Sequence, residues 1–541
     1  MVENVACMLK KWLFALSFVL VLGAGQALPA HMQDDEPITF TGHIDDRVES
    51  QDFTVTLTEG VSVLVTTEAE GDDKLDTIVT VYDPSGEVVA NNDDADSSTR
   101  DSRAVFLVRE TGEYRINVTR YDKSTSGSYI LRVETGSMDL LNYNVSLSGE
   151  PLILDTEHFR IHYTLSGVDA VDENFLEAIA QAFEDAYRIE VEQMGWPAPP
   201  EDDVMGGNAL YDVYIMNTIG SGEDALGLAS PELFVGDNPS TPEIETYAAT
   251  SYIAIDNDFG DIDFDDHQNA VSVMRATAFH EYHHAIQFGF DAAEPHSWLL
   301  EATATWMETV GAGKDQDATG YISTAYSYPE LCFGTSGEDG SVMYGEWTFM
   351  QFLTDEYGDD VMLRLWRAVA DQEGFDAVSL MLEAYDATVP QVVGRYRLNN
   401  LARNYELAPL FDATVWLEET ITDVGEWTYT GAGIQELGAN YFEFDAPAGV
   451  YEVELRNDRN ELTLWAIGLN DDGLDVVDLG RGGGIDTTGY ERMYLMVFNP
   501  LYDNDVDSCS YNDYQIEVLT GKGTTNPVIA TLNRTYFEPL S

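Results

Sequence analysis

The sequence predicts a multidomain protein: an all-β sandwich, then an α+β domain, then a second all-β sandwich. The first observation is length, because 541 residues are too many for one hydrophobic core. The second is that residues 34–150 and 406–541 consist of short segments in which apolar and polar residues alternate between turn residues. The third is that residues 151–405 combine a few strand-like segments with long stretches of helical periodicity.

Residues 1–30 are expected to be a secretory signal peptide. Two lysines precede the apolar run of residues 12–25 and small residues follow it, so we expect cleavage after Ala27 or Ala30. The run is short for a membrane span, and charged residues come soon after it. The sequence therefore predicts a secreted, extracellular protein with no membrane span.

The charge of the chain limits its partners. It has 97 aspartate and glutamate residues against 26 lysine and arginine residues, a formal net charge of −71. Such a surface repels nucleic-acid phosphates and anionic lipid headgroups, so neither is an expected partner. It also repels itself, and 1 M salt shortens the screening length to about 3 Å. The composition indicates a halophilic protein, with a calcium-rich secreted protein from ordinary water as the alternative. The oligomeric state is left open.

The N-terminal all-β region carries a first resemblance. The segments "DTIVTVYDPSGEVVANNDDAD", "AVFLVRETGEYRINV" and "GSYILRV" follow one another within residues 38–135. In this order they resemble the pre-peptidase C-terminal (PPC) domain of secreted peptidases. The resemblance implies a small jelly-roll-like sandwich that often binds calcium. Asp76, Asp93 and Asp94 are the candidate calcium ligands, because hard cations prefer clustered oxygens. Acidic turns without a metal are the alternative.

The residues that carry chemistry are concentrated in the sequence "HEYHH", His280 to His284. Three of the chain's nine histidines lie here, on a predicted helix over residues 267–288. Positions four apart lie one turn apart on the same face of a helix, so His280 and His284 can bind one metal ion. Glu281 lies beside them, where it can accept a proton from water. The alternative is a polar patch on a helix of an acidic protein.

A catalytic zinc ion needs a third protein ligand. A third histidine in the pattern H-x-x-G-x-x-H is excluded. Counted from His284, Gln287 stands in place of the glycine and Phe290 in place of the histidine. Glu301 follows His284 by 17 residues on the next predicted helix, and a short loop can return it to the metal. Glu308, two turns further along the same face, is the competing choice. We favour Glu301, because it is nearer in sequence and a small residue after it allows close helix packing.

The segments "FHEYHHAIQFGFD" and "WLLEATATWME" resemble those of gluzincin metallopeptidases, and hyicolysin-like peptidases show a related arrangement. The resemblance covers about residues 150–400. It implies a zincin-like α+β domain, with His280, His284 and Glu301 as Zn²⁺ ligands and Glu281 as the general base. It also implies a protein or peptide substrate, which would lie along "SYIAIDND" as the edge strand of a sheet.

Further residues are expected to support or surround the site. Tyr344 in "VMYGEW" is the candidate hydrogen-bond donor to the oxyanion of a peptidase reaction, and a buried core tyrosine is the alternative. His283 lies off the metal-facing line and is expected to pack against or support the site. His296 is expected at the surface, with a place in the cleft as the alternative. The acidic run of residues 256–266 is a second candidate for Ca²⁺, which halophilic composition explains nearly as well.

Cys332 and Cys509 are the two cysteines outside the predicted signal peptide. In an exported chain two cysteines can form a disulfide. They can equally remain free and buried, and the sequence leaves this open.

The sequence thus predicts a secreted zinc metalloendopeptidase. The alternative is a catalytically inactive relative that acts as a calcium-dependent surface-binding or adhesion protein. Retention of His280, Glu281, His284 and Glu301 favours the enzyme. A further rival is a metal-dependent hydrolase whose substrate is not a peptide.

Overall fold

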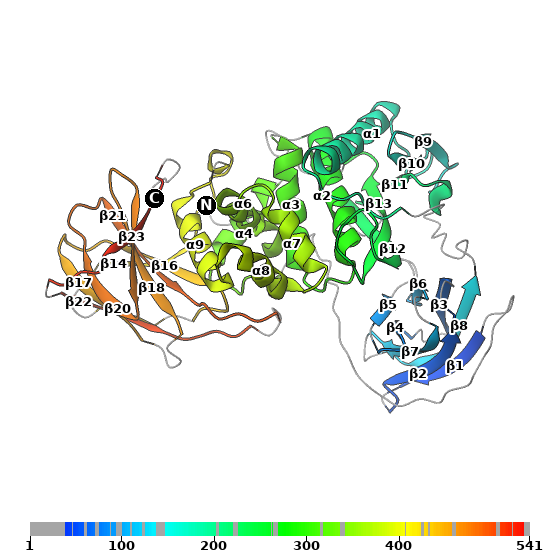
Figure 1. Cartoon of the computed structure of the whole chain (residues 1–541), viewed down its shortest axis with the longest axis horizontal. Coiled ribbons are helices and arrows are strands. Elements are labelled where there is room, and N and C mark those ends of the chain that lie inside the picture. Colours follow the sequence, from blue (N-terminus) through cyan, green and yellow to red (C-terminus); the bar gives the residue numbers. More distant parts are fainter. Residues whose placement is uncertain are drawn as a thin grey trace. The chain divides into compact units, whose positions relative to one another are not determined.

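The computed structural model describes most of the chain between Ile38 and Arg534 (Figure 1). The predicted signal peptide and the candidate ligands Asp93 and Asp94 lie outside the described residues. The chain divides into two compact units, one ending at Ala293 and one beginning at Glu294, and each is described by itself. Within the stated bounds the residues not described are 46, 59–61, 71–74, 87, 93–99, 109–110, 122–124, 137–146, 202–204, 220–224, 261, 263–268, 314–317, 336–340, 406, 423–426, 431–432, 457–460, 505–508 and 522.

The first unit begins with two four-stranded antiparallel sheets, which confirm the all-β prediction. Alternate residues of the strands are buried, and they form one core that includes Val65, Val79, Phe106, Ile116 and Leu131. This is the period-two pattern of a sheet with one face in the core. One sheet has the order β1 (Ile38–Ile44), β8 (Gly127–Gly136), β3 (Ser62–Glu70), β6 (Arg103–Leu107), and the other β2 (Ser50–Leu57), β7 (Gly112–Arg120), β4 (Thr77–Tyr82), β5 (Val88–Asn92).

A five-stranded mixed sheet follows in the same unit. Its order is β12 (Gly227–Gly236), β13 (Ala248–Asp256), β11 (Tyr211–Met216), β10 (Phe159–Tyr163), β9 (Leu152–Asp155). The three central strands are parallel, and the two outer strands are antiparallel to their neighbours. The expectation that "SYIAIDND" is an edge strand is wrong, because β13 pairs on both sides. The edge strands are β12 and β9.

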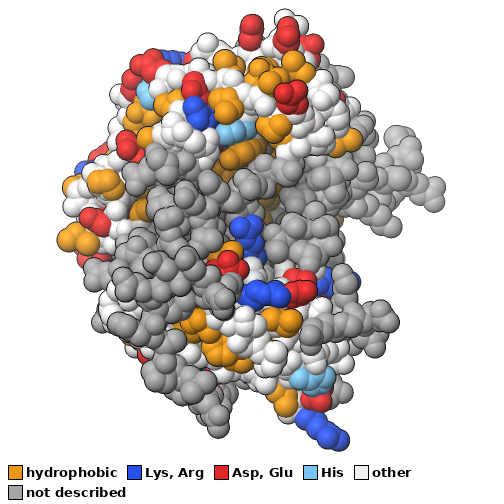
Figure 2. All heavy atoms as spheres, turned by 90° about the vertical axis from the view of Figure 1, so that its right-hand side faces the viewer, with side chains coloured by type: hydrophobic (Ala, Val, Ile, Leu, Met, Phe, Trp, Pro, Cys, Tyr) orange, Lys and Arg blue, Asp and Glu red, His pale blue; other side chains and the backbone are white. Residues whose placement is uncertain are grey.

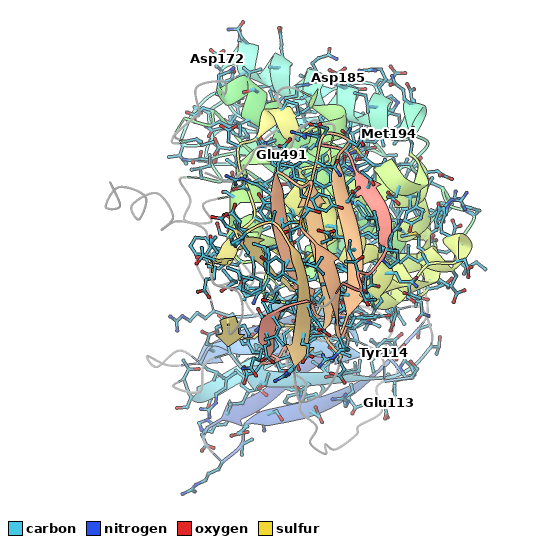
Figure 3. All side chains as sticks on the ribbon, turned by 90° about the vertical axis from the view of Figure 1, so that its left-hand side faces the viewer. Glu113, Tyr114, Asp172, Asp185, Met194 and Glu491 are labelled. Carbon is cyan, nitrogen blue, oxygen red and sulfur yellow. A yellow bond between two sulfur atoms is a disulfide. The ribbon has the colours of Figure 1, made fainter. Side chains whose placement is uncertain are left out.

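Two helices pack near this sheet. Helix α1 (Glu173–Tyr187) continues into the π-helical segment η2 (Arg188–Gln193), and α2 (Ala270–Asp291) packs against β13 and α1. Asp172 caps α1 by accepting a hydrogen bond from the Asn174 N–H. Figure 3 labels Asp172 and also Asp185, which lies near the other end of α1. Asn269 and Ser272 form a capping box that starts α2. The helix predicted over residues 267–288 is therefore present.

The second unit opens with a helical region. Helix α3 (Ser297–Gly311) packs against α5 (Val342–Gly345) and α6 (Trp347–Tyr357). The other helices are α4 (Ile322–Ser327), α7 (Val361–Val369), α8 (Gly374–Leu382) and α9 (Val389–Ala402). Short helical turns also belong to this unit: η5 (Ala318–Gly320), η6 (Glu383–Tyr385) and η7 (Ala408–Leu410). Another, η3 (Met205–Gly207), lies in the first unit.

Two further sheets complete the second unit and confirm the all-β prediction for residues 406–541. Their facing side chains form one buried core that includes Phe442, Val453, Leu464, Leu495 and Ile516. The larger sheet has the order β14 (Leu417–Ile421), β16 (Ala439–Phe444), β21 (Arg492–Phe498), β18 (Thr463–Leu469), β19 (Leu474–Gly480), β23 (Val528–Leu532), and the smaller has β15 (Trp427–Thr430), β22 (Gln515–Thr520), β17 (Val450–Arg456), β20 (Gly482–Asp486).

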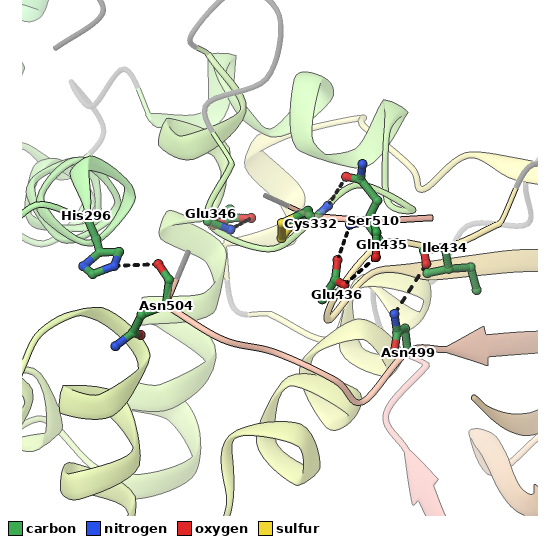
Figure 4. Close-up of a disulfide and its surroundings, with 11 residues drawn as sticks. His296, Cys332, Glu346, Ile434, Gln435, Glu436, Asn499, Asn504 and Ser510 are labelled. Atoms are coloured by element: carbon green, nitrogen blue, oxygen red, sulfur yellow. Dashed lines mark hydrogen bonds between the residues drawn. A yellow bond between two sulfur atoms is a disulfide. The ribbon is translucent and has the colours of Figure 1, made fainter. Parts of the chain in front are cut away.

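A disulfide joins the helical region of this unit to its sandwich (Figure 4). Cys332, which follows α4, is bonded to Cys509, which precedes β22. The Cys332 N–H also donates to Gln435 Oε1 at 2.9 Å, and the Phe333 N–H donates to the Glu436 carbonyl at 3.1 Å. The structure thus decides the question that the sequence left open: the two cysteines are paired and not free.

No helix within the described ranges combines the length and the apolar composition that a membrane crossing requires. Figure 2 shows one face of the molecule, on which the Asp and Glu side chains are spread rather than gathered in a single patch. Charges that are exposed to solvent are screened by salt.

Candidate metal centre

The centre of the candidate site is the middle of α2, where two imidazoles converge. His280 and His284 lie one helical turn apart, and their Nε2 atoms are 3.1 Å from each other. Both side chains are buried, with 9% and 8% of their surface exposed. A tetrahedral zinc ion with Zn–N bonds of about 2.0–2.1 Å holds its ligand nitrogens about 3.3 Å apart. The observed pair therefore already has close to the spacing that one zinc ion requires.

The other ring nitrogen of His284 has a defined partner. Its Nδ1 lies 2.7 Å from Oε1 of Gln287, one turn further along α2. An amide oxygen only accepts hydrogen bonds, so Nδ1 carries the proton and Nε2 keeps its lone pair. In the sequence, Gln287 stands out only because it breaks another ligand pattern. Its spacing of three residues from His284 is the signal that would have shown it, because such positions are neighbours on a helix.

Glu281 lies against the edge strand of the sheet. A Cβ atom added to Gly227, the first residue of β12, would lie 2.9 Å from Cγ and 3.2 Å from Oε1 of Glu281. The same added atom would lie 2.9 Å from the Cγ2 methyl of Thr277, one turn before Glu281 on α2. Glu281 is 6% exposed. The carboxylate is thus held in a narrow space that exists only because residue 227 has no side chain.

Substitution of Gly227 by alanine is expected to displace the Glu281 carboxylate. The added methyl group would contact it below van der Waals distance, and a displacement near 1 Å in a catalytic group costs up to about 100-fold in rate. On the sequence-based expectation that Glu281 is the general base of a zinc peptidase, kcat/KM for peptide hydrolysis should fall by about 10- to 100-fold with unchanged zinc content. Gly320→Ala is the matched control, because its added Cβ meets no atom within 4 Å. Equal activity of the two variants would contradict this role of Gly227.

His283 faces away from the converging imidazoles. Its Nδ1 lies 2.9 Å from Oε2 of Glu190 in η2, and its ring meets Trp196 edge-on at 4.7 Å. His283 and Glu190 are both fully buried. Burial raises the pKa of Glu190 and lowers the pKa of His283, so the uncharged forms are favoured. His283 therefore ties α2 to η2, the segment that continues α1.

The third expected ligand lies on α3. Among the described residues, His280, His284 and Glu301 form one of two sets of side chains suited to hold a metal ion. The other set contains Cys332 and Cys509, whose sulfurs are already bonded to each other. Glu308, the competing choice, is buried and belongs to neither of these two sets of described residues.

Tyr344 lies on α5, which packs against α3. It is half-buried and not a core residue, and its ring stacks on that of Tyr321 with centroids 5.1 Å apart. Gly345 allows this arrangement, because a Cβ there would lie 2.6 Å from the Tyr321 carbonyl oxygen. Its role as an oxyanion donor stays a prediction.

His296 is not a surface residue, and that expectation is wrong. Only 8% of it is exposed. Its Nδ1 lies 2.5 Å from Glu294 Oε1, and its Nε2 lies 2.8 Å from the carbonyl oxygen of Asn504 (Figure 4). Asn504 Oδ1 in turn accepts from the Phe375 N–H at the start of α8. His296 thus connects the start of α3 to a loop of the C-terminal sandwich.

Stability is expected to depend on the charge of His296. Burial opposes its ionisation, but the hydrogen bond and charge of Glu294, with Glu373 nearby, outweigh burial and raise the pKa of His296. A group whose pKa is raised in the folded state makes its full contribution to stability below its unfolded pKa of about 6.5. That contribution is lost as pH rises through the folded pKa. The Tm advantage of wild type over His296→Gln should therefore be largest below about pH 6.5 and shrink above it. Parallel Tm curves from about pH 5.5 to 9 would refute this.

The candidate calcium ligands remain predictions. Asp76 is 3.6 Å from Arg100 in an ion pair. Asp256 accepts from the backbone N–H groups of Phe259 and Ile219 at 2.7 and 3.1 Å, so its oxygens stabilise the local loop. Several residues of the run 256–266 lie outside the described part of the chain.

Comparisons with known proteins give only distant similarity. No protein-family model and no curated protein matches the chain. The pre-peptidase C-terminal domain of a collagenase from Bacillus anthracis is 16% identical over 21% of this chain and all of that domain, with a TM-score of 0.17. A metallopeptidase from Bacteroides thetaiotaomicron is 14% identical over 65% of this chain and 59% of its own, with a TM-score of 0.27. The catalytic module of the metalloprotease ZmpA from Clostridium perfringens is 9% identical over 84% of this chain and 92% of its own, with a TM-score of 0.26.

Proposed function

We propose that the protein is a secreted zinc-dependent metalloendopeptidase that works in high salt. His280, His284 and Glu301 would hold Zn²⁺, and Glu281 would be the general base. The observation that carries this proposal is the convergence of two buried Nε2 atoms 3.1 Å apart, with a confined glutamate between them in sequence. A polar patch on a helix would be exposed, whereas these three side chains are each less than 10% exposed.

The residues fit zinc in donor type as well as in spacing. Two neutral imidazoles and one carboxylate are a donor set that catalytic zinc sites use, and three protein ligands leave a position open for water. The Gln287 hydrogen bond favours the tautomer of His284 in which Nε2 can bind a metal. A zinc ion held there would supply Lewis-acid chemistry that activates water and polarises a peptide carbonyl.

The chain's own residues would then divide the remaining work. Glu281 takes the proton of the attacking water and passes it to the leaving amine, which needs a carboxylate within hydrogen-bond reach of both. The edge strand β12 begins at Gly227 beside Glu281, so a peptide added to that edge would pass the base. Tyr344 is the proposed donor to the developing oxyanion. The N-terminal sandwich is proposed to bind calcium and to serve an accessory binding role.

The test combines zinc content with hydrolysis of casein and a peptide library in high salt. Wild type is expected to bind about one zinc ion per chain, to cut peptides, and to stop cutting when a chelator removes the metal. Glu301→Gln should lose zinc, and Glu308→Gln should keep it. Zinc binding without cleavage of any peptide would indicate an inactive relative or another substrate. Absence of zinc binding by wild type would overturn the proposal.

A further inference from the structure

We infer that Gln287 is a positioning residue of the metal centre, which holds His284 in the one tautomer and ring orientation that can bind the metal. This inference rests on the proposed zinc site. It concerns the neutral amide one turn beyond the second histidine, a residue that touches neither substrate nor metal. Gln287 would act only through the imidazole of His284.

The geometry of the hydrogen bond supports this role. Oε1 of Gln287 lies 2.7 Å from Nδ1 of His284, and Gln287 is fully buried. A neutral imidazole has one N–H, and an oxygen acceptor at Nδ1 keeps that proton away from Nε2. The Nε2 atom freed in this way is the one that lies 3.1 Å from Nε2 of His280. The same hydrogen bond also fixes the ring plane, because it restrains rotation about the side chain.

The placement of both residues on α2 makes the contact precise. Residues three apart lie on one face of a helix, so the backbone itself sets their separation. Histidines that bind metals commonly donate their second N–H to a carboxylate, a carbonyl or a water, and loss of that partner costs about 10- to 100-fold in metal affinity. Gln287 supplies a carbonyl-type oxygen of this kind from within the same helix.

The neutrality of the acceptor has a consequence for the chemistry. A carboxylate at this position would make the imidazole more basic and add negative charge beside the metal. One carboxylate ligand, Glu301, leaves a divalent ion with net positive charge, which is what lowers the pKa of nearby water. In a chain with 97 acidic residues, an amide at this position preserves that positive charge. Gln287 would thus orient the ligand without weakening the metal as a Lewis acid.

The experiment measures the zinc dissociation constant by competition with a chelator, together with the Tm of each metal-free protein. Gln287→Met keeps the size of the side chain but removes the acceptor, and it is expected to weaken zinc binding by about 10- to 100-fold. Gln287→Glu restores an acceptor, so its zinc affinity should stay within a few-fold of wild type. Its optimum pH for hydrolysis should shift upward, because the extra charge opposes ionisation of water.

Ser272→Ala is the matched control, because it removes a capping hydrogen bond from the start of the same helix without touching either histidine. It should lower the Tm and leave zinc affinity unchanged. Equal zinc affinity of Gln287→Met and wild type would overturn the inference, whatever their Tm values. So would equal loss of affinity in Gln287→Met and Gln287→Glu. If wild type itself binds no zinc, the proposed function fails and not this inference alone.

Discussion

Replacement of Glu281 by glutamine is expected to lower kcat/KM for peptide hydrolysis by about 10²- to 10⁴-fold while zinc content stays the same. The range is that of a positioned general acid–base group. Glutamine has nearly the size of glutamate, so it fits the narrow space beside Gly227. It cannot accept a proton from water, and it therefore removes the chemistry without removing the side chain.

Unchanged zinc content would show that the lost activity comes from the missing general base and not from damage to the metal site. Glu281 lies between the two histidines in sequence, but the donor set proposed for the metal does not include it. Glu308→Gln is the matched control, because Glu308 is a buried glutamate on the next helix along the chain and lies outside that set. It should retain most of the activity. A Glu281→Gln protein that holds zinc and still cuts at the wild-type rate would exclude Glu281 as the base.

Much of the fold could be predicted from local periodicity. Strand β17, for example, alternates buried residues with exposed or half-buried ones, and that alternation is visible in its sequence. Helix α2 could be placed within a few residues, because its histidine spacing requires a helix. The histidines themselves indicated the site, since the four-residue spacing is a local property of one helix.

The strand order of the mixed sheet could not be predicted in the same way. Every residue of β13 is buried, which is typical of a central strand covered on both faces. The edge strand next to it, β12, contains Pro231 and two irregularities of register, so it lacks clean alternation. The order of strands depends on pairing between segments far apart in sequence, and periodicity within one segment carries no information about it.

The role of His296 was missed for a related reason. Its partners are Glu294, two residues away, and Asn504, which is 208 residues away. The first contact could have been suggested by sequence, but the second depends on how the C-terminal sandwich meets the helices of its unit. A histidine in a polar, proline-containing connection is therefore predicted at the surface although the fold buries it.

The Cys332–Cys509 disulfide is expected to account for a large part of the stability of the second unit. It closes a loop of 177 residues, and in the chain-entropy model a loop of this length is worth about 5 kcal/mol, near the upper limit of measured values. We expect the double variant Cys332→Ala/Cys509→Ala to lose about 2–5 kcal/mol in free energy of unfolding. The bond links the helical region to the sandwich within one unit, so the loss should affect both together.

Denaturant unfolding in high salt would measure this loss, with zinc content followed in parallel. Reduced wild type is the natural control, because it lacks the bond but keeps both sulfurs, and it should unfold at nearly the same denaturant concentration as the double variant. If oxidised wild type unfolded at that same denaturant concentration, the bond would add nothing to stability. A reduced protein that unfolds early and yet binds zinc as tightly as wild type would show that the bond secures the unit as a whole. It would also show that α2 itself holds the two histidines of the proposed metal centre in place, as the local hydrogen bond between Gln287 and His284 indicates.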